Sequence, residues 1–197
     1  MAQIDAAVTA RSAPSVRSPA RTVRLGQAAF GVTSAAWAVA VVLDLRTGAY
    51  ATLVYVCVAE ALAVMGLLLT TRMPQHRVSW VIAIAALWWA IAGLANAYAI
   101  EALVEDPGSL PGGLAAAWFD NWAWLPGLAL FLGSLLVLMP DGSLPSRRWW
   151  PVPVSLAVGT VLASAALSAT SSFDIAGQPV SNPLASGSVA LAAAGVT

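Results

Sequence analysis

The sequence predicts an all-α integral membrane protein with five transmembrane helices, a partial sixth and a cytoplasmic N-terminus. Of the 197 residues, 59% are hydrophobic and 9% are charged, whereas a soluble domain carries roughly 25% charged residues. So few charges do not cover a globular surface in water, but they suit a chain that is surrounded by lipid. The other two observations are long uncharged runs and an uneven distribution of arginines along the chain.

Five apolar runs are long enough to span a bilayer, and short polar segments separate them. The predicted spans are residues 25–43, 50–70, 79–100, 118–139 and 152–170. A last run, residues 188–197, is shorter than the roughly 20 residues that a crossing needs, so it predicts the start of a sixth span. Residues 101–108 are expected to form an acidic loop and residues 171–187 a polar loop.

Residues 1–24 precede the transmembrane domain, residues 25–197, and predict a disordered basic tail. This tail combines four arginines with Ser, Ala and Pro and shows no apolar period. Two alternatives stay open from the sequence. One is a transit peptide, which is also rich in Arg and Ser, and the other is a signal peptide cleaved near Ala38–Ala40 with an unusually long basic region.

The arginines indicate the orientation of the chain. With the N-terminus inside, the tail and the loops at 71–78 and 140–151 hold eight arginines, namely Arg11, Arg17, Arg21, Arg24, Arg72, Arg77, Arg147 and Arg148. The segments expected outside hold only Arg46, against the acidic residues Asp44, Glu101, Glu105, Asp106 and Asp174. An excess of Arg on the cytoplasmic side is the usual pattern in membrane proteins. The sequence therefore predicts a multi-pass protein of the plasma membrane, the inner membrane of the cell.

The segment 140–151, Pro-Asp-Gly-Ser-Leu-Pro-Ser-Arg-Arg-Trp-Trp-Pro, is expected to turn the chain back into the membrane. Its Pro-Asp-Gly start favours a turn, and Pro145 disfavours a helix at Leu144. Arginine side chains stay in water, while indole rings suit the headgroup layer. We therefore expect a set of inner-surface lipid anchors that consists of Arg72, Arg77, Arg147, Arg148, Trp149 and Trp150.

Glu60 is the most unusual residue within a predicted span, because an ionised carboxylate in the middle of a bilayer is costly. No Arg, Lys or His lies inside the predicted spans to neutralise it. We expect Glu60 to be protonated or hydrogen-bonded to a polar group such as Asn96 or an indole N–H. Two interpretations stay open: a ligand contact or proton-linked switch, and a polar group that fastens two helices together.

Two further groups of residues are candidates for a ligand site or for helix packing. Trp89, Gly93 and Asn96 share one helix face by their i, i+4, i+7 spacing, which suits either a cavity wall or an ordinary helix interface. The outer end of the 118–139 span holds Trp118, Asp120, Asn121, Trp122 and Trp124, followed by Pro126 as an expected kink. Aromatic rings beside an acid suit a cationic or amphipathic ligand, and equally an interfacial tryptophan belt.

Several kinds of site are not expected from the sequence. Cys57 is the only cysteine, so the chain has no pair of thiols for a disulfide or a thiolate metal site. His76 has no partner at metal-ligand spacing. The sequence holds no phosphate-binding glycine loop, nucleophile elbow or nucleic-acid patch. We therefore expect no metal, no cofactor, no nucleic-acid partner and no catalytic residue in this chain.

Residues 140–151 resemble the PDGRLPS-R-W-P loop in the N-terminal membrane region of actinobacterial-type sensor histidine kinases. Three further segments are similar to habits of that family: Pro107–Gly112, Trp122–Leu128 and Asn182–Leu184. The likeness covers about residues 50–185. At the entry to the third span the family often carries Asn-Pro-Ile-Gly-Trp, whereas this chain has His-Arg-Val-Ser-Trp at 76–80 and keeps only the Trp.

This resemblance implies the membrane-embedded input module of a two-component system, which perceives a signal without catalysis in this chain. In the family, later helices lead to a dimerisation helix with the phosphoacceptor His and then to an ATP-binding domain. Residues 1–197 contain neither, so the family's catalytic residues have no positions here. Besides the lipid bilayer, the expected partners are a second copy of the chain and, if the chain is a fragment, a kinase core and a response regulator.

The nature of the stimulus and two other functions stay open at this point. Short outer loops favour a lipid, an amphipathic antibiotic or a membrane-state signal over a large soluble ligand. One alternative function is a small stand-alone transporter-like protein that uses Glu60 as a proton-linked site. Another is an accessory membrane protein that binds partner helices.

Replacing Glu60 by Gln distinguishes a helix fastener from a proton-linked site. If Glu60 fastens helices, Glu60→Gln keeps the protein folded and changes its stability by less than about 1 kcal/mol, because the amide still accepts a hydrogen bond. Thermal unfolding in detergent measures this change. A folded variant that loses proton-driven uptake in proteoliposomes would contradict the fastener and favour the transporter.

Overall fold

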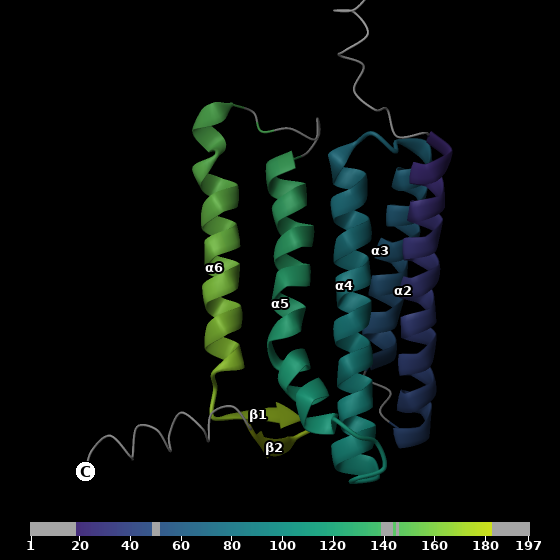
Figure 1. The fold of residues 1–197 in the computed structure, drawn as a ribbon, viewed down its shortest axis with the longest axis vertical. Coiled ribbons are helices and arrows are strands. Elements are labelled where there is room, and N and C mark those ends of the chain that lie inside the picture. Colours follow the sequence, from purple (N-terminus) through teal and green to yellow (C-terminus); the bar gives the residue numbers. More distant parts are fainter. Residues whose placement is uncertain (1–18, 49–51, 139–143, 145, 183–197) are drawn as a thin grey trace, which may run out of the picture.

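The computed structural model describes residues 19–48, 52–138, 144 and 146–182, and helices dominate it (Figure 1). The five long helices are α2 (Pro19–Thr47), α3 (Thr52–Arg72), α4 (Arg77–Ile100), α5 (Gly113–Leu138) and α6 (Pro151–Ser168). The shorter elements are the π-helix η1 (Glu101–Glu105), the 3₁₀ helix η2 (Arg147–Trp149) and the strands β1 (Ser172–Ile175) and β2 (Gln178–Ser181). The helical class that the sequence predicts is confirmed.

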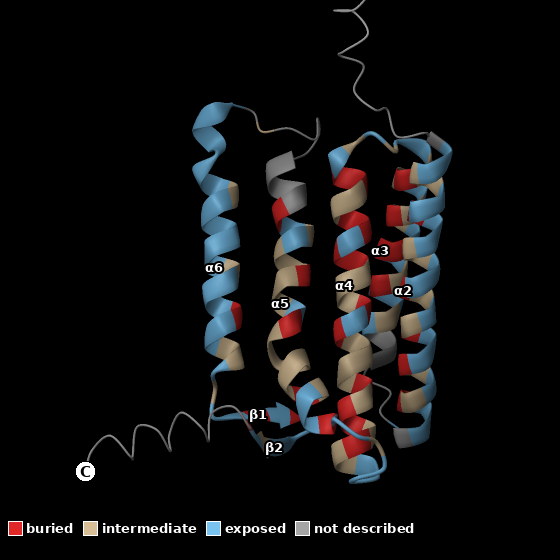
Figure 2. Cartoon of the chain, in the orientation of Figure 1, coloured by how far each residue is buried: buried red, intermediate tan, exposed pale blue. Residues whose placement is uncertain are grey.

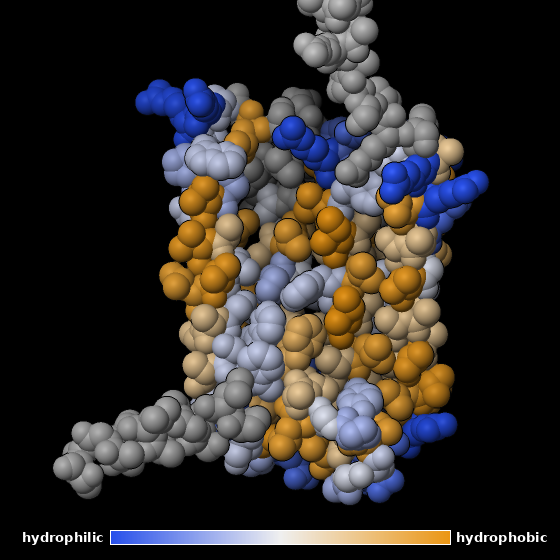
Figure 3. Space-filling model, viewed as in Figure 1, coloured by the Kyte–Doolittle hydropathy of each residue, from blue (hydrophilic) through white to orange (hydrophobic). Residues whose placement is uncertain are grey.

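Within the described residues, four helical segments are long and apolar enough to cross a membrane. They are Ala20–Arg46, Tyr55–Arg72, Arg77–Glu105 and Arg147–Ser168. On the face that Figure 3 shows, the strongly hydrophilic residues lie at the two ends, and between them hydrophobic residues predominate with some weakly polar ones among them. The 26-residue helix α5 is not among the four, and its first half carries the polar residues Asp120 and Asn121.

Three segments differ from the sequence-based expectation. α2 begins at Pro19, so residues 19–24 of the expected disordered tail are helical; a proline suits the first turn, where its missing N–H would have no partner. The acidic segment after α4 is not a loop at its start, because η1 continues the helix to Glu105. Much of the expected loop at 171–187 is a β-hairpin.

Residues 1–18, 139–143 and the expected partial sixth span at 188–197 lie outside the described residues.

The helices form a compact group of three with two further helices added on one side. α2, α3 and α4 pack against one another, α5 packs on α4, and α6 packs mainly on α5 (Figure 1). The core of the first three helices consists of Trp37, Ala40, Ala59, Ala90 and Ala97. Alanines let helix backbones approach closely, which is the usual source of helix association in a bilayer. α6 is exposed along almost its whole length, and Ser164 is its one buried residue (Figure 2).

Trp37 fixes the contact between α2 and α4. Its indole is only 4% exposed, and its six-membered ring lies where a side chain at position 93 would begin. Gly93 therefore leaves the space that the ring occupies. This explains the glycine on the α4 face that the sequence singles out, and it assigns that position to packing against α2.

The β-hairpin closes one end of the α4–α5 pair. Ala176 and Gly177 form its turn with φ angles of 52° and 80°, as expected for a two-residue hairpin turn with positive φ at both positions. The Asp174 carboxylate accepts the Gly177 N–H at 2.8 Å. A buried cluster lies where the hairpin meets the two helices. The hairpin contributes Phe173 and Ile175, α4 contributes Ala99 and Ile100, and α5 contributes Ala117. We call this side of the bundle the hairpin end.

The opposite side, the arginine end, holds six of the seven arginines in the described residues: Arg21, Arg24, Arg72, Arg77, Arg147 and Arg148. All of the expected lipid anchors lie here, and the rings of Trp149 and Trp150 are 50% and 62% exposed. Arg46 lies at the hairpin end with the acidic residues of η1. The antiparallel arrangement of the helices thus brings together the arginines that the sequence separates.

Replacing Gly93 by Ala is expected to destabilise the protein by about 1–3 kcal/mol, because a new methyl group in a packed core displaces its neighbours. The matched control is Gly31→Ala on α2, where the added carbon meets nothing within 4 Å. Thermal unfolding in detergent measures both. Equal stability of the two variants would contradict the role assigned to the Trp37–Gly93 contact.

Candidate functional site

Pro126 lies in the interior of α5 and interrupts its hydrogen bonding. A proline has no N–H to donate to the carbonyl four residues earlier, and its ring crowds that carbonyl. α5 changes direction toward α4 in its hairpin-end portion (Figure 1). In a bilayer, donors on neighbouring helices must satisfy backbone groups that such a kink frees, because no water is present.

Two indoles of α4 supply donors to this part of α5. Trp88 Nε1 donates to the Ala123 carbonyl, and Trp89 Nε1 donates to the Trp124 carbonyl at 3.2 Å. Both carbonyls belong to the turn that precedes Pro126. We call Trp88 and Trp89, together with the α5 carbonyls that they bind, the indole clamp.

Gly127 allows this close approach of α4 and α5. A Cβ at position 127 would lie 2.7 Å from Cδ1 of Trp89 and 3.1 Å from Cδ1 of Trp88. The first distance is shorter than the contacts that a Cβ atom makes with other residues, so a side chain here would displace the Trp89 ring. The Pro126–Gly127 pair therefore has two functions in the fold, since the proline bends α5 and the glycine makes room for the rings.

An aromatic cluster extends from the indole clamp toward the hairpin end. Ring centroids lie 5.2 Å apart for Phe119 and Trp122, 5.7 Å for Trp118 and Trp122, and 6.1 Å for Trp88 and Phe119. These are edge-on or tilted contacts, the arrangements that aromatic rings prefer. The indole N–H of Trp122 is buried and has no hydrogen-bond acceptor among the described residues.

Asn96 and Asp120 join α4 to α5 beside this cluster. The Asn96 Nδ2 group donates to Asp120 Oδ2 at 2.7 Å, and both residues are partly buried. Glu60 does not take part. It accepts a hydrogen bond from the Ser34 hydroxyl at 3.1 Å and so joins α3 to α2. Glu60 is thus hydrogen-bonded to a polar group, as one of the expected alternatives holds, but the partner is the Ser34 hydroxyl and not Asn96, which binds Asp120.

Trp118 and Asn121 bind the end of α6. Trp118 Nε1 donates to the Ser168 carbonyl at 2.9 Å, and Asn121 Nδ2 donates to the Leu167 carbonyl at 2.8 Å. Asn182 Nδ2 donates to Ser168 and to Thr170 at 2.9 and 2.6 Å. The last carbonyls of a helix have no partner within it, so these three side chains cap α6, and Trp118 and Asn121 also fasten it to α5.

The structure thus gathers most of the sequence-based site candidates at one interface. Those on the α4–α5 contact are Trp89, Asn96, Asp120, Trp122 and Trp124, whereas Asn121 lies on the contact between α5 and α6. Trp118 and Trp122 pack within the aromatic cluster, whereas Trp124 is 44% exposed. Trp88, Phe119 and Asn182 were not among the sequence-based site candidates, although the adjacent Trp88–Trp89 pair was a visible signal.

Within the described residues, no group of three or more His, Cys, Asp or Glu side chains is placed to hold a metal ion. Comparisons with protein-family models, with curated proteins and with solved structures found no match to this chain.

Trp88→Phe is expected to destabilise the protein by about 1 kcal/mol, because the ring is kept but one hydrogen bond to a buried carbonyl is lost. In a Pro126→Ala background the same change is expected to cost less, since alanine restores the backbone N–H and straightens this turn of α5. Trp150→Phe at an exposed ring is the control. Equal costs of Trp88→Phe in both backgrounds would show that the indole and the kink are independent.

Proposed function

We propose that this chain is a membrane-embedded input module of the kind found in two-component sensor histidine kinases, perceiving a signal without catalysis of its own. In this proposal α5 is the fourth of five spans, the arginine end faces the cytoplasm and the hairpin end faces outward across the plasma membrane. The observation that carries the proposal is the proline kink of α5. The kinked helix lies between the compact group of α2, α3 and α4 on one side and α6 on the other. Trp88 and Trp89 of α4 donate hydrogen bonds to carbonyls beside the kink.

In the proposed module, two packing states differ in the bend of α5. A stimulus shifts a conformational equilibrium only if it binds one state better than the other. α2, α3 and α4 form a packed reference, whereas the bend of α5 depends on a small number of hydrogen bonds to α4. A change in that bend moves α6, because Trp118 and Asn121 fasten the two helices at the hairpin end.

Asn182 extends this connection to the chain beyond the hairpin. It is the last described residue, it is 2% exposed, and it binds the carbonyls at the end of α6. The position where the chain leaves the hairpin is therefore tied to α6 and, through it, to α5. In the proposed module, the segment after Asn182 receives the movement and carries it toward the cytoplasm.

The connections at the hairpin end are short, which supports a stimulus that reaches the module from the membrane. α4 and α5 are joined by η1 and residues 106–112, and α6 is followed by the small hairpin. A lipid, an amphipathic antibiotic or a change in the bilayer itself fits these connections better than a large soluble ligand does. A transporter-like function receives less support, because Glu60 and Asp120 pair at different helix interfaces and do not face a common path.

A chimera tests the proposed function. Residues 1–197 are joined to the cytoplasmic core of a sensor histidine kinase at a series of junctions that covers one heptad, so that one junction has the correct helix phase. In vesicles with lipids of different chain length, autophosphorylation is expected to change by at least about fivefold, a typical coupling between two sites. Pro126→Ala, which removes the kink, is expected to abolish that response.

The matched control is Pro179→Ala, at an exposed position of β2, and it is expected to leave the response intact. Circular dichroism confirms that each chimera is folded. Constant autophosphorylation in every vesicle and at every junction would contradict the input-module proposal.

A further inference from the structure

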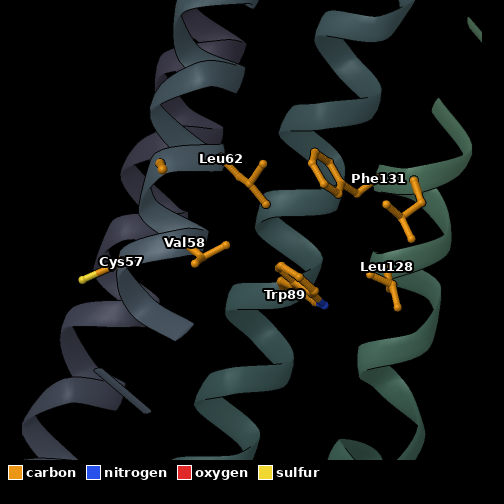
Figure 4. A pocket seen from close by; sticks show the side chains of 8 residues that line it. Cys57, Val58, Leu62, Trp89, Leu128 and Phe131 are labelled. Atoms are coloured by element: carbon orange, nitrogen blue, oxygen red, sulfur yellow. The ribbon is translucent and has the colours of Figure 1, made fainter. Parts of the chain in front are cut away.

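An apolar groove lies between α3 and α5, with α4 as its floor (Figure 4). Its volume is about 430 Å³. Val58 and Leu62 extend from α3 toward α5, Phe131 extends from α5 toward α3, and Trp89 lies between them on α4 (Figure 4). Leu128 and Leu132 complete the α5 wall.

The groove is open at its rim and closed at its floor. Val58 and Leu132 are 52% and 45% exposed, whereas Leu62 is 8% exposed. Its walls carry no charged side chain and no hydroxyl or amide group. The one polar group of its floor, the Trp89 N–H, is already donated to the Trp124 carbonyl. An occupant therefore meets hydrocarbon and aromatic surface only.

The position of the groove along the helices determines what surrounds it. Leu62 lies at the middle of α3 and Trp89 at the middle of α4, two helices that are long and apolar enough to cross a membrane. The surroundings at that depth are the hydrocarbon core of the bilayer, about 30 Å thick. A vacant groove there would leave its walls without contact partners and would lose their dispersion energy.

The lining of the groove distinguishes between a lipid chain and a partner helix. Helices that associate within a bilayer pack through small residues and through polar side chains. Ala61 is the one small residue of this kind in the lining, and the rim carries the large apolar side chains of Val58, Leu128 and Leu132. This surface therefore suits a hydrocarbon chain, which is narrow enough to reach Trp89 and Leu62, better than a helix of a second copy.

We propose that this groove binds one hydrocarbon chain of a membrane phospholipid. The binding itself does not depend on the input-module proposal, but in that module it would identify the ligand class and its point of action. Trp89 contacts the groove with its ring and the α5 kink with its N–H. Leu128, two residues after Pro126, lines the same groove. A bound chain therefore supports the kinked form of α5 directly.

Lipid retention by the purified protein tests this proposal. The protein is reconstituted with palmitoyl-oleoyl phosphatidylglycerol and transferred to detergent, and native mass spectrometry counts the phospholipids that remain bound. One retained phospholipid per chain is expected. Ala61→Phe, which fills the groove from α3, is expected to lower the lipid-bound fraction by about tenfold, a loss of about 1.4 kcal/mol in binding.

Two further variants complete the experiment. Ala163→Phe, at an exposed alanine of α6 outside the groove, is the matched control and is expected to retain the lipid. Leu132→Trp narrows the groove from the α5 side and is expected to act as Ala61→Phe does, so the test does not depend on one variant being folded. Glycerophosphoglycerol, the headgroup without chains, is expected not to compete.

Three results would overturn the proposal. The first is equal lipid retention by all folded variants, and the second is competition by the headgroup alone. The third is a disulfide between the Cys57 thiols of two chains when membranes are oxidised, because Cys57 lines the groove and is the only cysteine. That disulfide would identify a second copy as the occupant. None of these results bears on the chimera experiment, so the two proposals fail separately.

Discussion

The hydrogen bonds between two α4 indoles and the α5 backbone beside Pro126 organise the α4–α5 half of the structure. Pro126 has no N–H for the Trp122 carbonyl, and the indoles of Trp88 and Trp89 donate to the carbonyls of the next two residues, Ala123 and Trp124. In the proposed membrane setting a backbone group without a partner costs several kcal/mol, so donors from a neighbouring helix stabilise α5 where its own ladder is interrupted. A glycine at position 127 leaves the room that the two rings need.

The remaining polar contacts of the helices follow the same rule and differ in what they connect. Ser34 and Glu60 close the α2–α3 contact within the compact group, whereas Asn96 and Asp120 close the contact that the kinked helix makes. Each pair satisfies its own groups. Each of these two pairs joins neighbouring helices by a hydrogen bond, and the proposed sensing element is the bend of α5 with the groove beside it.

Hydropathy and the positions of the arginines were sufficient to locate the five long helices, because the length and composition of an apolar run are enough to predict where a long helix lies. They did not identify packing partners, since these helices are apolar on all sides and no stripe marks the buried face. Trp88 and Trp89 project about 100° apart on an ideal helix, so a helix-face argument selects only one of them. Both reach α5 because that helix bends. The hairpin was missed because its short strands are buried only by contact with distant segments.

The pairing of Asn96 with Asp120 also has a consequence for the order in which the chain is made. On the proposed topology α5 carries the Asp120 carboxyl into the membrane near its outer end, where the cost to insertion is smaller than the cost of about 2.5–3.5 kcal/mol for an aspartate at the helix centre. α4 precedes α5 in the sequence, so the amide that binds this carboxyl is already in place when α5 is synthesised. The later helix thus enters the bilayer as a partner of the earlier one, and membrane integration and tertiary packing become a single step.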